Sequence, residues 1–186
     1  DWDAVVAVHL KGHFCISSHA VKYWREQVKG GAKVDARIIN TSSGAGLQGS
    51  IGQSNYAAAK GGIASLTLVQ AAELRRYGIT ANALAPAART GMTEQVFADT
   101  MKKPDEGFDY FAPENVAPLV VWLGSEASAE VTGQMFEIEG GKLSIADGWR
   151  RGPQLDRQGR WAVGEMGEAV AQLVAQAIPA AKVYGS

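Results

Sequence analysis

The sequence has very little cysteine and almost no net charge. Its 186 residues include a single cysteine, Cys15, so no internal disulfide can stabilise the fold. A lone cysteine fits a reducing cytosol, and we expect a cytoplasmic protein in which Cys15 is a small buried hydrophobe. The formal net charge of −1 gives no electrostatic argument for a nucleic-acid partner or for a membrane surface.

Long apolar runs and an initiator methionine are also lacking, and we expect no signal peptide. No apolar stretch approaches the roughly 20 residues that a membrane-spanning helix needs. The chain begins directly in an amphipathic segment at Asp1-Trp2-Asp3, so we expect it to be part of a longer chain. What is present, 46% hydrophobic and 20% charged residues, is typical of a globular domain with a substantial core.

Hydrophobic periodicity and turn residues predict alternating helices and strands. A long amphipathic helix is expected over about 2–27, and a second helix should run from Ser54 or Asn55 to about Tyr77, ended by Gly78. We expect further helices at about 91–101, 113–124 and 164–177, and buried strands at 37–41, 79–85 and 134–138. This alternation predicts an α/β fold with a parallel sheet. Three short strands make a poor sheet, so missing strands should lie upstream of Asp1.

The glycine-rich segment after the first strand invites a dinucleotide-binding interpretation that we reject. Residues 44–49 match G-x-G-x-x-G, a pattern that lets a pyrophosphate approach a helix N-terminus. The predicted helix, however, opens only near Asn55, and the next strand ends in Ala85-Pro86 without the acidic residue that would hold a ribose. The pattern therefore favours a flexible loop, from Gly44 to Gly52, beside an active site.

Two other kinds of site are not supported. The three histidines, His9, His13 and His19, show no metal-ligand spacing with carboxylates or cysteines, so we expect no metal. Residues 52–56 lack the final glycine of the G-x-S-x-G turn that presents a nucleophilic serine. A zinc enzyme and an acyl-enzyme hydrolase are both disfavoured.

Tyr56, Lys60 and Ser43 form the constellation that carries chemistry. Tyr56 and Lys60 are four residues apart on one predicted helix, so they share a face. A lysine ammonium favours the phenolate form of a nearby tyrosine, which can then exchange a proton with an alcohol or carbonyl. Ser43 follows the preceding strand, and its hydroxyl could bond the same substrate oxygen. Each element alone is typical of a solvated helix face or a turn; their combination points to catalysis.

These residues resemble a known family. Residues 40–43 (NTSS), 52–62 (GQSNYAAAKGG), 78–86 (GITANALAP) and 131–134 (VTGQ) resemble the core of short-chain dehydrogenases/reductases, and the resemblance covers about 1–148. His9 stands where that family often has asparagine, and Pro86-Ala87 where it usually has Pro-Gly. Both departures are shared by a narrower group, the (3R)-hydroxyacyl-CoA dehydrogenase unit of peroxisomal multifunctional enzymes and its bacterial relatives, which the chain also resembles.

The resemblance implies a fold, a domain division and site residues. The fold would be the C-terminal portion of a Rossmann-like doubly wound parallel sheet, with residues 1–149 the catalytic portion and 150–186 an extension with one helix. Tyr56 would be the general acid/base, Ser43 would stabilise the substrate oxygen, and Lys60 would assist Tyr56 and hold the nicotinamide ribose. His9 would act in a proton relay or simply pack within its helix. The predicted cofactor-binding residues are Tyr56, Lys60, Pro86, Ala87, Ala88 and Thr90.

The implied activity is hydride transfer between NAD or NADP and a secondary alcohol or ketone, with a 3-hydroxyacyl thioester such as a CoA thioester as substrate. The alternatives are a hydroxysteroid or other small-alcohol dehydrogenase, and a non-catalytic member of the fold. The two long helices correspond to those that pair between subunits in the family, which implies a homodimer or homotetramer. We expect the 186 residues alone to bind the cofactor poorly.

Residues 88–112 lie where the family closes over its substrate. Their apolar members would either line an acyl channel or form the packing face of a short helix. These members are Met92, Val96, Phe97, Met101, Phe108, Tyr110 and Phe111.

Overall fold

The computed structural model describes residues 1–91, 93 and 99–184 and divides the chain into two compact units. The larger unit comprises Asp1–Ala146 and the residues from Val183 onward, and it contains the whole sheet. The smaller unit, Asp147–Lys182, contains one α-helix, α7 (Met166–Gln176), which begins after the 3₁₀ turn Val163–Glu165. The helix expected at 164–177 is therefore confirmed.

The N-terminal helix is longer and less regular than its sequence predicts. It begins with α1 (Trp2–Val6), continues through a π-helical segment, Ala7–Lys11, and ends with α2 (Gly12–Lys29). At the end of the π-helical segment the Gly12 amide donates to the carbonyl of Ala7, five residues back. No proline or glycine marks residues 7–11, so the periodicity predicted an uninterrupted α-helix.

Cys15 lies on the outer face of α2 and is exposed, so the prediction of a buried cysteine is wrong. Ser17, two residues further along, is the residue of α2 that is buried. Because two residues correspond to just over half a helical turn, burial of Ser17 directs Cys15 to the opposite side.

The sheet has four strands in the order β1-β2-β3-β4. Strands β1 (Ala36–Thr41), β2 (Ile79–Ala87) and β3 (Met135–Glu139) are parallel and confirm the three predicted strands. Strand β4 (Lys142–Ile145) pairs antiparallel with β3 and was not predicted. Its four exposed residues are too few to show a period, and it is joined to β3 by Gly140-Gly141.

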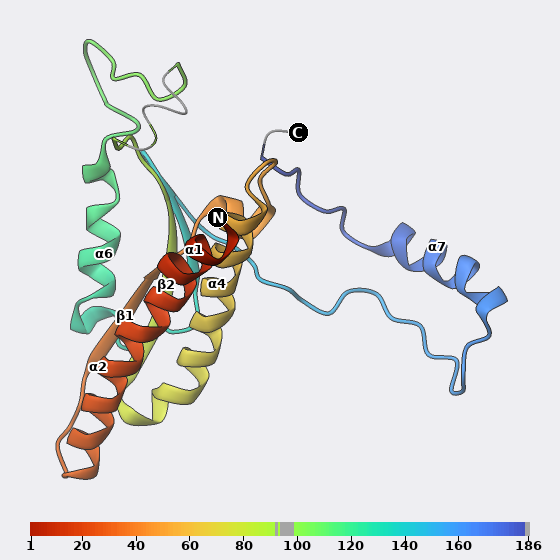
Figure 1. Ribbon diagram of the computed structural model, residues 1–186, viewed down its shortest axis with the longest axis horizontal. Helices are drawn as coiled ribbons and strands as arrows, with labels where there is room; N and C mark the ends of the chain where they lie inside the picture. Colours follow the sequence, from red (N-terminus) through yellow and green to blue (C-terminus); the bar gives the residue numbers. More distant parts are fainter. Residues whose placement is uncertain (92, 94–98, 185–186) are drawn as a thin grey trace. The chain divides into compact units, whose positions relative to one another are not determined.

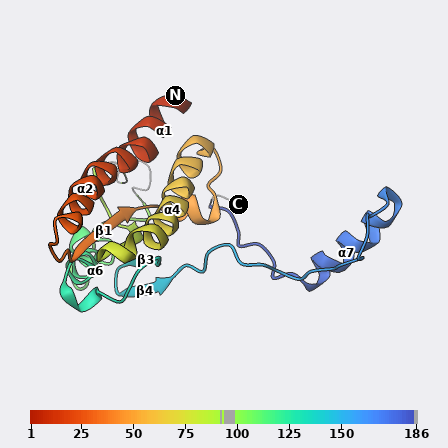
Figure 2. The ribbon, with the colours of Figure 1, turned by 90° about the horizontal axis from the view of Figure 1, so that it is seen from below.

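Helices cover both faces of the sheet, as Figures 1 and 2 show. On one face α2 and α4 (Ser54–Leu74) pack against β1 and β2, with Leu74, Ile79 and Ala81 in the buried cluster. On the other face α6 (Ala117–Leu123) buries Leu119 and Leu123 against the sheet. This layering is that of a doubly wound α/β sheet. The predicted helix 113–124 corresponds to a 3₁₀ turn, Pro113–Asn115, followed by α6.

Helix α4 ends where the sequence predicts. After Leu74 the chain makes a 3₁₀ turn, Arg75–Tyr77, and Gly78 adopts the left-handed conformation with φ of 73°. A side chain there would be strained and would meet the carbonyl oxygen of Val34 at 2.0 Å. Glycine at this position is thus required both by the backbone and by its neighbour.

The glycine-rich segment after β1 is partly helical, which corrects the prediction of a flexible loop from Gly44 to Gly52. Residues Gly44–Gln48 form a short helix, α3, capped by Ser43, and only the residues from Gly49 to Gln53 link it to α4. The predicted helix at 91–101 falls largely on residues outside those that the structure describes.

Within the described ranges, no helix combines the length and apolar character needed to cross a bilayer.

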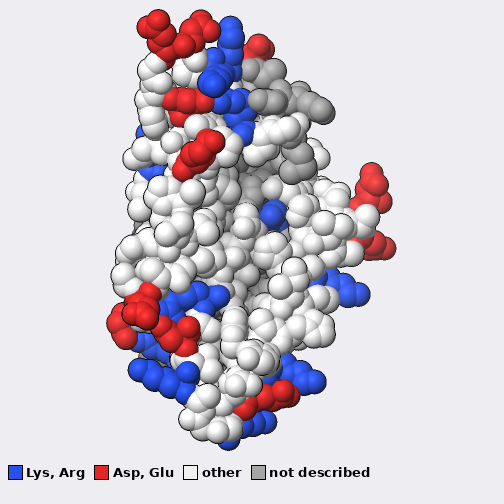
Figure 3. Space-filling model, turned by 90° about the vertical axis from the view of Figure 1, so that its left-hand side faces the viewer, with Lys and Arg blue, Asp and Glu red and all other residues white. Residues whose placement is uncertain are grey.

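Figure 3 shows one face of the molecule, where charged side chains gather toward the two ends and leave a mostly uncharged area between them. Acidic and basic groups are interspersed at both ends of this face.

Candidate active site

Tyr56 and Lys60 lie on the same side of α4, as their spacing predicts. The Lys60 ammonium nitrogen is 5.6 Å from the centre of the Tyr56 ring. No residue of the described part of the chain hydrogen-bonds the Tyr56 hydroxyl, whose oxygen is therefore available to a ligand. A partly buried tyrosine with an open hydroxyl and a neighbouring cation is suited to proton exchange.

Lys60 is buried, with 6% of its surface exposed. Its ammonium Nζ donates to the carbonyl oxygen of Thr41, the last residue of β1, at 2.9 Å. Burial lowers the Lys60 pKa from its ordinary value, because the charged form loses its hydration. A lysine held in this way is both a fixed cation beside Tyr56 and a readier proton donor than an exposed lysine.

Ser43 caps α3 and still keeps its own proton for a ligand. The amide of Ala45 donates to Ser43 Oγ at 3.3 Å, which uses one lone pair of the hydroxyl. The neighbouring Ser42 donates its hydroxyl to the carbonyl of Lys60 at 2.8 Å and so ties this turn to α4. Helix α3 approaches α4 very closely at Gly46, which leaves no room for a Cβ atom. The candidate serine is thus carried on a segment packed against the helix of Tyr56 and Lys60.

His9 lies in the π-helical segment and contacts Tyr56. The two rings are nearly perpendicular, at 87°, with their centres 5.2 Å apart. Burial, followed by the charge of Lys60, lowers the His9 pKa below its ordinary value. The imidazole is therefore mainly neutral at pH 7.

The predicted cofactor-binding residues lie at the carboxyl end of β2 and just beyond it. Pro86 and Ala87 pair with β3, while Ala88 accepts a hydrogen bond through its carbonyl from Thr93 Oγ1 at 3.0 Å. The Thr90 hydroxyl lies 3.2 Å from Thr93 Oγ1, so it is engaged within its own turn. Pro86 and Ala87, the last residues of β2, and Ala88 after them are partly buried.

Arg89 and Asp109 form an ion pair between the two ends of the segment 88–112. This pair was not predicted from the sequence. Arg89 Nη1 donates to Asp109 Oδ1 at 3.1 Å and to the Met101 carbonyl at 2.9 Å, and a second nitrogen, Nη2, pairs with Asp109 Oδ2. Hydrogen bonds from Arg89 lower the Asp109 pKa. Twenty residues separate the pair, and no periodic pattern connects them.

The residues proposed for an acyl channel are only partly described. Met92, Val96 and Phe97 lie outside the described residues. Tyr110 stacks edge-on against Phe108 and Phe111, with ring centres 6.4 and 5.0 Å away, and donates its hydroxyl to Glu139 Oε1 at 3.0 Å. The three aromatic rings contact one another outside any helix, and Phe108 is 64% exposed, so these contacts show neither an acyl channel nor the packing face of a short helix.

The C-terminal residues add a tyrosine that nothing in the sequence marked. The backbone of Tyr184 pairs with the loop after α3, donating to Gly49 and accepting from Ile51. Its ring lies against Gly44, where a Cβ atom would come within 2.6 Å of the hydroxyl. Burial, followed by the charges of Glu137 and Glu139, raises the Tyr184 pKa. Tyr184 therefore borders the turn that begins at Ser43.

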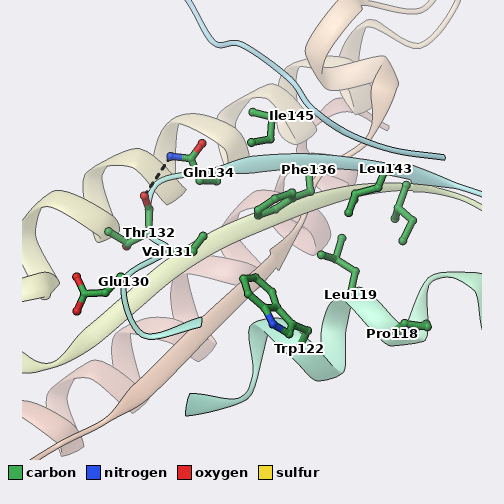
Figure 4. Close-up of a pocket in the computed structure, with 11 residues that line it drawn as sticks. Pro118, Leu119, Trp122, Glu130, Val131, Thr132, Gln134, Phe136, Leu143 and Ile145 are labelled. Atoms are coloured by element: carbon green, nitrogen blue, oxygen red, sulfur yellow. Dashed lines mark hydrogen bonds between the residues drawn. The ribbon is translucent and has the colours of Figure 1, made fainter. Parts of the chain in front are cut away.

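A separate hollow of about 700 Å³ lies on the α6 face of the sheet (Figure 4). Its walls are mainly apolar, with Trp122 and Leu119 of α6 facing Phe136 of β3 and Leu143 of β4. None of the predicted site residues lines it, since Tyr56 and Lys60 lie on the α4 face. Within the described part of the chain, no group of three or more His, Cys, Asp and Glu side chains could hold a metal ion.

Comparison with known proteins gives consistent matches. A family profile described as short chain dehydrogenase matches residues 1–101. Hydroxyacyl-CoA dehydrogenase ChsB1 of Mycobacterium tuberculosis is 48% identical over 147 residues, which are 78% of this chain and 46% of that protein. The (3R)-3-hydroxyacyl-CoA dehydrogenase of Homo sapiens is 40% identical over 145 residues, 76% of this chain and 54% of that protein.

Solved structures agree with these sequence matches. The crystal structure of a short chain dehydrogenase from Mycobacterium avium superposes with a TM-score of 0.88 at 55% identity, covering 100% of this chain and 60% of that one. The full-length peroxisomal multifunctional enzyme type 2 from Drosophila melanogaster gives a TM-score of 0.70 at 27% identity, over 93% of this chain and 30% of that one. The chain spans 14% to 56% of the length of the curated relatives that it matches.

Proposed function

Because the chain belongs to the short-chain dehydrogenase family, we propose that it carries the proton-transfer half of an NAD(P)-dependent oxidoreductase. The observation that supports this most directly is the open hydroxyl of Tyr56 beside the buried ammonium of Lys60, with 5.6 Å between Nζ and the ring centre. A scaffold protein of the same fold would have no need of this arrangement. We also propose that residues 1–149 are the catalytic portion and residues 150–186 an extension.

Each residue has a distinct role in the proposal. In the reducing direction Tyr56 Oη gives its proton to the carbonyl oxygen of the substrate, and in the oxidising direction it takes the alcohol proton. The Ser43 hydroxyl donates to the same oxygen and stabilises the negative charge that develops there. Lys60, fixed by the Thr41 carbonyl, places a positive charge beside the Tyr56 ring and the substrate oxygen that it would protonate.

The residues present fit a nicotinamide cofactor, which would supply or accept the hydride. Pro86, Ala87 and Ala88 lie at the carboxyl end of β2, the end of the strands where ligands bind in open α/β sheets. Lys60 and Tyr56 would hold the ribose next to the ring. Thr90 would contact the carboxamide only if its hydroxyl turned away from Thr93.

For the substrate we propose a 3-hydroxyacyl thioester, such as the CoA ester. This proposal is supported by relatives that are named hydroxyacyl-CoA dehydrogenase and 3-oxoacyl-[acyl-carrier-protein] reductase, both of which handle acyl thioesters. A hydroxysteroid or other small alcohol is the alternative substrate.

We further propose that the protein is a homodimer or homotetramer that pairs through α2 and α4. Large apolar side chains on the outer surfaces of these helices support the proposal, because they gain from burial against another subunit. They are Phe14, Tyr23, Leu68 and Val69, each more than half exposed.

The test is a nicotinamide absorbance assay on the protein that contains this chain, with 3-hydroxyacyl-CoA and either NAD or NADP. Tyr56→Phe should lower kcat by about a thousandfold, since it removes the proton donor. Tyr77→Phe, the same change in the 3₁₀ turn that follows α4, should leave kcat unchanged. Full activity in Tyr56→Phe would refute the mechanism, and turnover of a steroid alcohol alone would favour the alternative substrate.

A further inference from the structure

His13 has no role in the mechanism above, yet both of its ring nitrogens have backbone partners. It lies on α2, one helical turn after His9. Nδ1 is 2.6 Å from the carbonyl oxygen of His9, and Nε2 accepts a hydrogen bond from the amide of Thr41 at 3.3 Å. The imidazole therefore joins the N-terminal helix to the end of β1.

The two partners define the protonation of the ring. A carbonyl oxygen only accepts, so Nδ1 must carry a proton, and an amide only donates, so Nε2 must not. Only the neutral imidazole with its proton on Nδ1 satisfies both contacts. A second proton on Nε2 would remove the acceptor for Thr41 and place a cation there instead.

Both partners are attached to groups that surround Tyr56. Thr41 holds Lys60, because its carbonyl accepts the hydrogen bond from Nζ at 2.9 Å. His9 belongs to the π-helical segment, and its ring contacts Tyr56 with 5.2 Å between the centres. The His13 ring thus connects the backbone that fixes Lys60 to the backbone that presents His9.

The π-helical segment makes this connection important. Such wide turns are rare and sit inside α-helices at a cost in hydrogen-bond geometry. Reversion to regular α-helix would rotate the residues before the segment about the helix axis, and His9 would turn relative to Tyr56. A side-chain donor on the His9 carbonyl opposes this rotation.

We propose that His13 is a positioning residue, which in its neutral Nδ1-protonated form locks the π-helical segment of His9 against the end of β1 that holds Lys60. The inference rests on the proposed function of Tyr56 and Lys60. It also predicts a specific tautomer and a specific ring contact, both of which can be measured without any turnover.

The first experiment compares His13→Phe with His19→Phe in the protein that contains this chain. His19 lies on the same helix, is exposed and provides a matched control. His13→Phe should lower kcat about ten- to hundredfold with little change in KM, since misplacement of catalytic groups affects the chemical step. His13→Asn, whose amide can still donate to the His9 carbonyl, should recover part of the loss. Wild-type kcat in a folded His13→Phe variant would overturn the proposal.

The second experiment is NMR with isotope-labelled histidine and needs no activity. The His13 signals should be those of a neutral ring protonated at Nδ1, and the His9 ring protons should show the shift caused by the Tyr56 ring. That shift should change in His13→Phe and His13→Asn by different amounts and stay constant in His19→Phe. A proton found on His13 Nε2 would disprove the positioning role, and so would a His9 ring-proton shift that is the same in wild type and in the His13 variants. Both results would hold even if the protein oxidised no hydroxyacyl-CoA. The absence of turnover would count only against the proposed function.

Discussion

Gly46 of α3 lies so close to Lys60 of α4 that a Cβ atom on Gly46 would come within 2.5 Å of the Lys60 carbonyl carbon. The backbone nitrogen of Gly61 would be only 2.6 Å away. Both neighbours are backbone atoms of a long helix, so neither can move aside. Glycine at this position lets the segment that carries Ser43 pack directly on the helix that carries Tyr56.

Gly46→Ala should therefore destabilise the protein and displace the active-site serine. Overpacking of a rigid contact costs about 1–3 kcal/mol in the free energy of unfolding. The measurement is urea unfolding together with kcat. Gly141→Ala is the control, because no atom lies within 4 Å of its added Cβ. Equal stability of the two variants would contradict the close packing.

Lys60→Met should flatten the dependence of stability on alkaline pH. Burial holds the Lys60 pKa below its ordinary value, so between the folded and unfolded pKa the unfolded chain binds more protons. The free energy of unfolding should therefore rise as pH increases through that window, and the Met variant should lack this part of the rise. Urea unfolding at a series of pH values rising from neutral to the ordinary lysine pKa of about 10.4 measures it. Lys29→Met, at the exposed end of α2, should behave as wild type.

Asn82→Ala should be strongly destabilising, whereas Thr80→Val on the same strand should not be. The Asn82 amide donates to the Val131 carbonyl at 2.8 Å and accepts from the Gln134 amide at 3.0 Å, so its loss leaves two backbone groups unpaired. We expect a cost of about 2–4 kcal/mol. Thr80 Oγ1 is buried with no hydrogen-bond partner in the described residues, and its removal should leave the melting temperature unchanged or higher. The opposite order of melting temperatures would reject this account.

Low pH should reduce the stabilisation that the ion pair between Arg89 and Asp109 gives to the fold. Because Arg89 lowers the Asp109 pKa, the stabilisation is complete above the ordinary carboxyl pKa of about 4 and is lost as pH falls through the lower folded value. Asp109→Asn should thus be less stable than wild type at pH 7. Its free energy of unfolding should fall less than that of wild type as the pH is lowered. Unfolding curves from about pH 7 to 3 test this, with the exposed Glu114→Gln as the control. Parallel curves for wild type and Asp109→Asn would contradict this stabilisation by the ion pair.

The part of the site that could be predicted consists of residues whose relative positions follow from their spacing along the sequence. Tyr56 and Lys60 share a helical face because four residues make about one turn. Ser43 could be placed because Thr41 ends a recognisable strand. The fold class followed in the same way from the alternation of helical and strand patterns.

What could not be predicted depends on contacts between distant residues or on backbone irregularity. The π-helical segment around His9 has the same residue types as an ordinary helix. The short helix at Gly44 looks like a loop by composition, because it contains two glycines, of which Gly44 packs against Tyr184 and Gly46 against Lys60. The Arg89–Asp109 pair and the two backbone contacts of His13 exist only once the chain is folded.

Strand β4 has a practical consequence for handling the protein. It is the last strand of the sheet, and its alternate side chains Leu143 and Ile145 are 59% and 55% exposed. An apolar terminal strand can recruit a strand from another molecule, so concentrated refolding should promote aggregation at this edge. Lys142 places one charge beside it. Replacement of Leu143 by a charged residue should improve the yield of soluble protein, because charge on β4 opposes strand pairing between two copies of the protein.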